Sequence, residues 1–324
     1  MKLTLIIATF NRATSLLRTL KSAVEQSAAA DLWECIVVNN NSTDNTEEIF
    51  DSFAAQHPQF NLKIVNETKQ GLSNARNRGI AEAQGEYIAI IDDDETIEES
   101  YIESYIEFFD SFPTAVAAGG AVIAQYESKK PKWMSKYTEQ MIANPLDLDV
   151  VVTTFPKSRV PAGGNMAFRK EAFDLVGTFN PRLGRNGKNL TGGEENDLFA
   201  RLREQNIPLY FVPNAAIYHH IPESKLTDEY FDTLSYNVGC SKRLRTRDDN
   251  ELRVLIAEEK KKRLATYILA TLYTLCLQPL KAKYLLRMRN GISRGIAEKE
   301  SLDKIRPPEI VEPLLLIPGN IANA

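Results

Sequence analysis

Four consecutive carboxylates, Asp92-Asp93-Asp94-Glu95, directly follow the apolar run at 86–91. Such a cluster at the end of a buried strand costs free energy through like-charge repulsion unless a cation lies beside it. Mg²⁺ and Mn²⁺ prefer oxygen ligands and often bind through one or two carboxylates together with substrate phosphates. We therefore predict a site for Mn²⁺ or Mg²⁺ here. The alternative is a solvated acidic turn before the next helix.

The same stretch also spells the Asp-x-Asp-x-Thr motif of haloacid-dehalogenase-type phosphatases, in which the first aspartate, here Asp92, is the nucleophile. That family usually carries the motif after its first strand and needs a later Gly-Asp-x-x-x-Asp. Here the motif follows the fourth expected strand, and the sequence contains no Gly-Asp-x-x-x-Asp. Both facts disfavour the phosphatase.

Polar side chains also follow the first two apolar runs. Thr9, Asn11 and Arg12 end the run at 3–10, and Asn39 and Asn40 follow the run at 33–38. Neither place carries Gly-x-Gly-x-x-Gly, which disfavours a dehydrogenase-type dinucleotide fold. Polar groups at adjacent strand ends could read a nucleobase and a ribose, although ordinary helix capping explains part of the pattern.

Three further residues are candidates for chemistry. Arg76 shares the apolar face of the helix expected at 72–83, where a guanidinium needs a carboxylate or a phosphate. Glu195 follows two glycines at the start of a helix expected at 194–205 and could act as a general base. His219 could bind a metal or a phosphate. The respective alternatives are a structural ion pair, a carboxylate that complements the helix dipole, and a structural histidine.

The elements that must position these residues alternate in type over the first 115 residues. Continuous apolar runs predict buried strands, and amphipathic patterns between them predict helices. Short loops between such elements indicate parallel βαβ units, whose ligands lie at the carboxyl ends of the strands. Strands are expected at 3–10, 33–38, 62–65, 86–91, 116–125, 209–212 and 216–218, and a mainly helical segment at 221–297.

Taken together, five motifs resemble family 2 inverting glycosyltransferases of the GT-A fold. They are IIATFNR, VVNNNSTDNT, GLSNARNRGIAEAQGEYIAIIDDDE, GGNMAFRKEAF and GGEENDLFARLRE, in the order in which that family carries them. The resemblance implies an α/β fold with a Rossmann-like, mostly parallel sheet flanked by helices, followed by a C-terminal helical extension. It divides the chain into a glycosyltransferase domain at 1–225, with a nucleotide-sugar half at 1–115 and an acceptor half at 116–225. A helical extension at 226–300 and a proline-containing tail at 301–324 follow.

The resemblance also assigns roles to single residues. It implies that Asp94 binds the metal, with His219 as a second ligand, and that Glu195 is the base. The donor contacts that it implies are Thr9, Asn11, Asn39, Asn40, Asp92 and Asp93, and we also predict that Arg12 and Arg76 help to hold the donor. Two positions depart from the common pattern: family members usually have aspartate where this chain has Asn39, and aspartate where it has Glu195. The first departure leaves the choice between uracil and guanine more open.

The function that follows is transfer of a sugar, with inversion, from a nucleotide-diphosphate sugar to a hydroxyl of a glycan or lipid-linked acceptor in polysaccharide or glycan biosynthesis. A UDP-sugar is favoured over a GDP-sugar. One alternative is a metal-dependent nucleotidyltransferase on a similar fold, which would not require Glu195. The other is a non-catalytic homologue that binds nucleotide sugars.

Charge is unevenly distributed along the chain. The net charge is −4, which argues against a broadly basic nucleic-acid-binding protein, yet residues 241–294 carry 14 Lys and Arg against 5 Asp and Glu. Within them, 264–280 is apolar but only about 25 Å long as a helix, too short to span a bilayer. We expect a helix that lies in the membrane interface or packs as core. Three widely spaced cysteines indicate a reducing compartment, so we expect a cytoplasmic protein, peripheral on the inner face of the membrane.

Overall fold

The computed structural model describes residues 1–187 and 190–298. Its first half is a parallel sheet in the order β3-β2-β1-β4. All seven residues of β1 and of β2 are buried, as expected for parallel strands covered by helices on both faces. The four strands are β1 (Leu3–Thr9), β2 (Trp33–Asn39), β3 (Asn61–Asn66) and β4 (Tyr87–Asp92).

The second half extends the same sheet with mixed strand directions. β8 (Met166–Arg169) pairs antiparallel with β4, and β6 (Ala117–Tyr126) pairs antiparallel with the other edge of β8. β9 (Tyr210–Ile221) is parallel to β6 and pairs on its other side with the short β5 (Glu95–Ile97). β7 (Thr153–Thr154) also pairs with β9. The two strands expected at 209–212 and 216–218 are therefore one longer strand.

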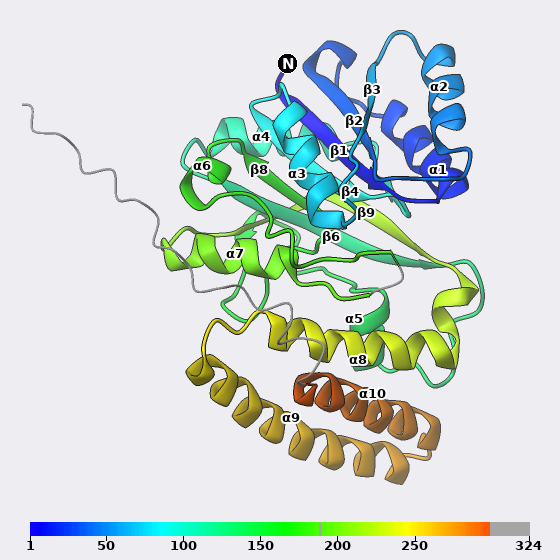
Figure 1. The fold of residues 1–324 in the computed structure, drawn as a ribbon, viewed down its shortest axis with the longest axis vertical. Coiled ribbons are helices and arrows are strands. Elements are labelled where there is room, and N and C mark those ends of the chain that lie inside the picture. The colour runs from blue at the N-terminus through cyan, green and yellow to red at the C-terminus, as the bar shows by residue number, and fades with distance from the viewer. Residues whose placement is uncertain (188–189, 299–324) are drawn as a thin grey trace, which may run out of the picture.

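Helices cover both faces of this sheet (Figure 1). A single apolar core joins sheet and helices from Leu3 to Ile217. The helices are α1 (Ala13–Val24), α2 (Thr46–Gln56), α3 (Leu72–Glu82), α4 (Tyr101–Ser111), α5 (Lys136–Ile142), α6 (Ala172–Val176) and α7 (Glu194–Glu204). The expected α/β fold, a mostly parallel sheet flanked by helices, is confirmed.

Three C-terminal helices complete the described chain: α8 (Asp228–Leu244), α9 (Asp249–Leu275) and α10 (Pro279–Ala297). Figure 1 shows α8 between the sheet and the hairpin formed by α9 and α10. A second apolar core unites α5, α8 and α10, where Trp133 stacks on Tyr284 with ring centroids 4.3 Å apart. The predicted extension is therefore helical, although it begins at Asp228, after β9 and a 3₁₀ turn at Glu223–Leu226, rather than at 221.

The prediction of one continuous helix at 264–280 is wrong. α9 ends at Leu275, Leu277 adopts a left-handed backbone conformation with φ of 56°, and α10 starts with Pro279 at its first turn. Proline lacks the amide N–H that would continue the helix, so the apolar run folds into a hairpin tip. No helix in 1–187 and 190–298 is long and apolar enough to cross a membrane.

Candidate active site

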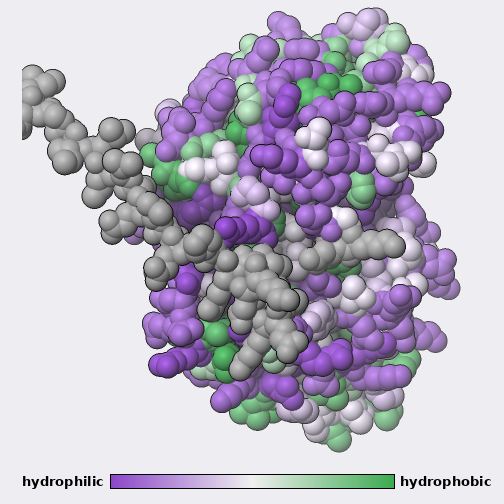
Figure 2. All heavy atoms as spheres, in the orientation of Figure 1, coloured by the Kyte–Doolittle hydropathy of each residue, from purple (hydrophilic) through white to green (hydrophobic). Residues whose placement is uncertain are grey.

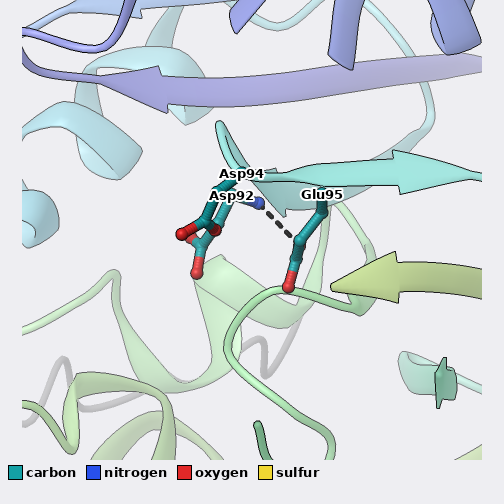
Figure 3. Close-up of side chains that lie close together, drawn as sticks. All are labelled: Asp92, Asp94 and Glu95. Carbon is teal, nitrogen blue, oxygen red and sulfur yellow. Dashed lines mark hydrogen bonds between the residues drawn. The ribbon is translucent and has the colours of Figure 1, made fainter. Parts of the chain in front are cut away.

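The carboxylate cluster lies in the tight turn between β4 and β5 (Figure 3). Oxygen atoms of Asp92, Asp94 and Glu95 all lie within 4.8 Å of one another. The backbone N–H of Asp92 donates a hydrogen bond to Glu95 Oε2 at 2.9 Å, which holds the turn closed. β5 pairs with β9 so that Glu95 lies opposite His219, and this register brings His219 beside the cluster.

Two cations contact Asp93 and Asp94 of the cluster. Arg12 Nη1 lies 2.9 Å from both Asp93 Oδ1 and Asp94 Oδ2, and Lys225 Nζ lies 2.6 Å from Asp94 Oδ2. Burial alone would raise the pKa of Asp94, but Lys225 and Arg12 hold that pKa far below its ordinary value. Burial raises the pKa of Asp93 to about 6 against the opposing charge of Arg12.

These residues fit a divalent metal. The turn offers only carboxylate oxygens, which are the ligands that Mn²⁺ and Mg²⁺ prefer. Asp94, predicted as a ligand, belongs to the group, and so does Glu95, which the sequence analysis placed in the acidic run without assigning it as a ligand. His219 lies at its edge: its Nε2 is 4.0 Å from Asp94 Oδ1 and 3.2 Å from Lys225 Nζ, while its Nδ1 faces the carbonyl of Ala143 at 3.0 Å. Its role as a ligand stays a prediction.

A cavity of about 260 Å³ opens on one side of this cluster, at the carboxyl ends of β1 and β4. Thr9 contributes to its wall and donates through Oγ1 to Asp93 Oδ2 at 2.8 Å. The predicted donor-binding residues that line it are Thr9, Asn11, Arg12, Asn40, Asp92 and Asp93. Most of the residues predicted to hold the donor therefore meet around one cavity.

The asparagines around this cavity mainly shape its loops. Asn40 donates to the carbonyls of Glu67 and Lys69 at 2.9 and 2.8 Å and accepts from the N–H of Gly71 at 2.8 Å. Asn11 Oδ1 accepts from the N–H of Thr43 at 2.7 Å. Asn39 Oδ1 accepts from the N–H of Ser42 at 3.0 Å, and Asn39 and Arg76 do not line this cavity.

Arg76 forms a buried junction between the two halves of the site. Its side chain is 1% exposed, and its guanidinium contacts Glu194 Oε1 at 2.6 Å, Asp92 Oδ1 at 2.8 Å and the Gly163 carbonyl at 2.8 Å. The carboxylate partners are those that the ion-pair alternative required. Glu194, which sequence reasoning missed, is buried: burial and the neighbouring Glu195 raise its pKa to about 7, while Arg76 opposes the rise. The sequence held one signal for it, a second glutamate beside Glu195.

Glu195 faces a second, larger cavity of about 670 Å³. Gly193, the N-cap of α7, has a φ of 95°, in the left-handed region that favours glycine. The side chain of Glu195 is partly exposed and accepts a hydrogen bond from the Asn196 amide. Asp92 and Arg185 line both cavities, so the two cavities meet beside the carboxylate cluster.

Comparison with known proteins identifies the class that this fold and site define. The fold is that of GT-A glycosyltransferases: a mannosyltransferase from Pyrobaculum calidifontis, solved with GDP-Man and Mn²⁺, matches with a TM-score of 0.59 at 19% identity over 90% of this chain and 87% of its own. GalNAc-T7, solved with UDP, GalNAc and Mn²⁺, matches with a TM-score of 0.55 at 15% identity over 76% of this chain and 50% of its own.

The family follows from the sequence. The model of Glycosyl transferase family 2 matches residues 4–177, and the chain belongs to this family. A glucosyl-dolichyl phosphate glucuronosyltransferase of Haloferax volcanii is 25% identical over 249 residues, which cover 75% of this chain and 77% of that protein. Chondroitin synthase of Escherichia coli is 26% identical over 255 residues, which cover 69% of this chain but only 35% of that protein.

Proposed function

We propose that this family 2 glycosyltransferase moves a sugar, with inversion, from a nucleotide-diphosphate sugar to an acceptor hydroxyl. The observation that carries the proposal is the meeting of two cavities at Asp92, one beside the carboxylate cluster and one beside Glu195. A donor bound in the first cavity would present its anomeric carbon toward an acceptor bound in the second. A UDP-sugar remains favoured over a GDP-sugar.

On the donor side, Asp94, Asp92 and Glu95 would hold Mn²⁺ or Mg²⁺, with His219 as a further candidate ligand. When bound, such an ion stabilises the negative charge of the leaving nucleotide diphosphate. Arg12 adds positive charge beside the same cavity, and Arg76 fixes Asp92 from within the core.

On the acceptor side, Glu195 is the proposed base. Its carboxylate takes the proton from the acceptor hydroxyl as the oxygen attacks the anomeric carbon. Attack from the face opposite the departing diphosphate inverts the anomeric centre in one displacement, by the stereochemical logic of inverting glycosidases. Glu194 is a positioning residue in this scheme, because its buried carboxylate is engaged by Arg76.

We also propose an acceptor that is a glycan or a lipid-linked sugar, used in polysaccharide or glycan biosynthesis. The Haloferax relative is named as a glucosyl-dolichyl phosphate glucuronosyltransferase, which supports a lipid-linked acceptor. A cytoplasmic protein, peripheral on the inner face of the membrane and in contact with it through residues 241–294, fits that acceptor and the excess of basic residues there.

The testing experiment separates donor binding from turnover. UDP and GDP are first compared by thermal shift with and without Mn²⁺, since a ligand of the folded state raises the melting temperature by mass action. The sugars of the better nucleotide are then screened for transfer. Glu195→Gln is expected to keep donor affinity and to lose about two orders of magnitude or more in turnover. Glu204→Gln, an exposed carboxylate on the same helix, is the matched control.

Each alternative gives a different result. Release of pyrophosphate from a nucleoside triphosphate incubated with a sugar 1-phosphate would indicate the nucleotidyltransferase. Donor binding without any turnover would indicate the non-catalytic homologue. A transfer product that retains the donor's anomeric configuration would overturn the inverting mechanism. Turnover of Glu195→Gln within a few-fold of the parent would reassign Glu195 to capping of α7.

A further inference from the structure

The larger cavity has a wall that the family match at 4–177 does not include. The C-terminal helices form this wall, and it carries a group of basic residues. α8 contributes Lys242 and, at its C-terminal end, Arg245, while α10 contributes Arg289. These three residues, which we call the basic wall, line the same cavity as Glu195.

The basic wall lies next to the proposed base. The N–H of Gly192 donates to Ser241 Oγ on α8 at 2.8 Å, which ties the wall to the loop before α7. Arg245 Nε lies only 3.0 Å from the point where a Cβ on Gly193 would stand. Gly193 immediately precedes Glu194 and Glu195, so a group bound by Arg245 would lie close to the reacting hydroxyl.

The charges of the basic wall are only partly neutralised. Arg289 Nη1 contacts Glu259 Oε2 at 2.9 Å, and its Nε contacts Thr266 Oγ1 at 3.2 Å. In the part of the chain that the structure describes, no carboxylate lies within 4.0 Å of Lys242 Nζ or of the Arg245 guanidinium. Burial, together with the charges of Lys262 and Arg289, lowers the pKa of Lys242 to about 8. Cations gathered in this way cost free energy unless an anion joins them.

Basic residues in the last turn of a helix are common, because they complement the helix dipole. That explanation accounts for Lys242 and Arg245 at the end of α8, but Arg289 comes from the middle of α10. Residues from two helices converge on one cavity, and a dipole effect within one helix does not produce this convergence.

We propose that Lys242, Arg245 and Arg289 bind a phosphate group of the acceptor, so that the acceptor is a phosphate-bearing molecule. The proposal deepens the proposed function. It rests on that function in one respect, namely that the phosphate-bearing molecule is the acceptor of the sugar. Guanidinium and ammonium groups bind phosphate through charge-assisted hydrogen bonds. Among the residues that the structure describes, the Arg245 side chain makes one hydrogen bond, from Nε to the Ser241 carbonyl at 3.4 Å. The phosphate would lie beside Glu195. Its binding there would orient the acceptor's hydroxyl toward the donor.

The phosphate has two chemical sources, a lipid phosphate and a water-soluble sugar phosphate. Apolar side chains beside the basic wall offer room for a carbon chain; they are Leu234, Val238, Met288 and Ile292. A phosphate carried on an alkyl chain and one carried on a sugar therefore form separate arms of the test.

The experiment measures binding without turnover, so that it remains informative if glycosyl transfer is never found. The full chain is titrated by calorimetry, first in buffer without divalent metal, with hexyl phosphate and with glucose 1-phosphate. Hexanol and methyl glucoside are the uncharged counterparts. We expect at least one phosphate probe to bind, and its counterpart not to bind. Lys242→Gln and Arg245→Gln should each weaken that binding about tenfold or more, the scale of one charge-assisted contact.

Lys261→Gln is the matched control, because Lys261 is exposed on α9 and does not line the cavity. It should bind the probe like the parent, and every variant should bind UDP with Mn²⁺ like the parent. Three results would overturn the proposal: no preference for phosphate over the neutral probe, unchanged affinity in both basic-wall variants, or complete displacement of the probe by UDP with Mn²⁺. The last result would assign the basic wall to the donor.

Discussion

Lys225 stands between the two side chains that the sequence suggested as metal ligands. Its Nζ is 2.6 Å from Asp94 Oδ2 and 3.2 Å from His219 Nε2, and its side chain is 8% exposed. An ammonium at this position neutralises the buried carboxylate that a divalent ion would also bind. Lys225 and a metal would therefore compete for Asp94, whose Oδ1 lies 4.0 Å from His219 Nε2.

Replacing Lys225 by methionine should make the stability of the folded protein depend more strongly on bound metal. Without metal, we expect the variant to lose up to about 3 kcal/mol of unfolding free energy, because one partner of a buried pair is gone while Arg12 remains. Mn²⁺ should then raise the melting temperature of the variant by more than that of the parent. Thermal unfolding with and without Mn²⁺ checks this, with the exposed Lys21→Met as control. Equal Mn²⁺ shifts in variant and parent would show that Lys225 does not compete with the ion.

The basic wall should make phosphate binding depend on pH. The pKa of Lys242 is about 8 because burial and the cations Lys262, Arg289 and Arg245 lower it, against Glu259. Lys242 is therefore charged below that pH and neutral above it. A phosphate monoester, whose second pKa is about 6, stays dianionic from pH 7 upward.

Affinity for the phosphate probe should accordingly be highest near pH 7 and should fall as the pH rises through about 8 toward 9. Lys242→Arg should flatten this profile, because a guanidinium stays charged throughout that range. Calorimetric titration of both proteins across the range is the measurement. A parallel loss of affinity in the two proteins would exclude Lys242 as the titrating group.

Whether the sequence could predict a contact in the site depended on how far apart along the chain the contacting residues lie. The acidic cluster was recognisable because its carboxylates are contiguous and follow a buried strand. Lys225 was not, because its approach to Asp94 depends on the pairing of β5 with β9 across more than a hundred residues. Arg76 illustrates an intermediate case: its position on an apolar helix face demanded an anionic partner, but only the fold shows that the partners are Asp92 and Glu194.

At the scale of elements, α8 and α10 approach each other closely through small residues. A Cβ on Gly295 would overlap the carbonyl oxygen of Tyr236 and stand 2.7 Å from the backbone N of Cys240. A Cβ on Gly239 would likewise overlap the carbonyl of Ile292. The backbone atoms of a packed helix cannot move aside alone, so glycine at these positions sets the distance between the two helices that carry the basic wall.

Gly295→Ala should therefore push α10 away from α8. We expect a loss of about 1–3 kcal/mol in unfolding free energy from overpacking, larger than the gain in helix propensity of about 1 kcal/mol. Phosphate binding at the basic wall should weaken, while UDP binding with Mn²⁺ should persist, because the donor cavity lies at β1 and β4. Urea denaturation and the two titrations measure this. Asn290→Ala, an exposed site on the same helix, is the control, and equal stability of the two variants would contradict the packing argument.

Sequence patterns predicted the βαβ half better than the C-terminal helices. Buried parallel strands appear as unbroken apolar runs, and these coincide with β1, β2 and β4 to within a residue or two at each end. In the extension, one apolar run contributes to two helices, because Leu277 and Pro279 reverse the chain within it. A pattern of hydrophobicity does not reveal that reversal, and only the proline offered a local signal.

Residues 241–294 carry 14 Lys and Arg against 5 Asp and Glu, so the C-terminal helices make one end of the molecule basic, and part of that end is apolar. The outer face of α9 presents an apolar stripe at helical spacing, made of Leu264, Tyr267, Ile268 and Leu272. The hairpin tip continues it with Leu275 and Leu277, which are 73% and 89% exposed, and with Leu280. Figure 2 shows hydrophobic surface at the lower end of the molecule, where Figure 1 places α9 and α10.

This end also carries exposed lysines, at 260–262 before the stripe and at 283 after the tip. Apolar side chains flanked by cations suit an anionic lipid surface, where each basic residue adds about 1 kcal/mol and buried apolar area adds the rest. The alternative raised by the sequence, a helix packed entirely as core, accounts for Thr266 and Ala270 but not for the exposed stripe.

Membrane contact can be measured by co-sedimentation with vesicles. The parent should pellet with anionic vesicles at low salt, should pellet less at high salt because salt screens the lysines, and should stay largely in solution with neutral vesicles. Replacing Leu275 and Leu277 together by serine should reduce pelleting at both salt concentrations, since it removes buried apolar area rather than charge. Val150→Ser changes a side chain that is 88% exposed elsewhere and should have no effect. If the parent remains in the supernatant with anionic vesicles at low salt, the apolar stripe does not bind membranes, and the basic wall would then have to receive a phosphate from a water-soluble acceptor.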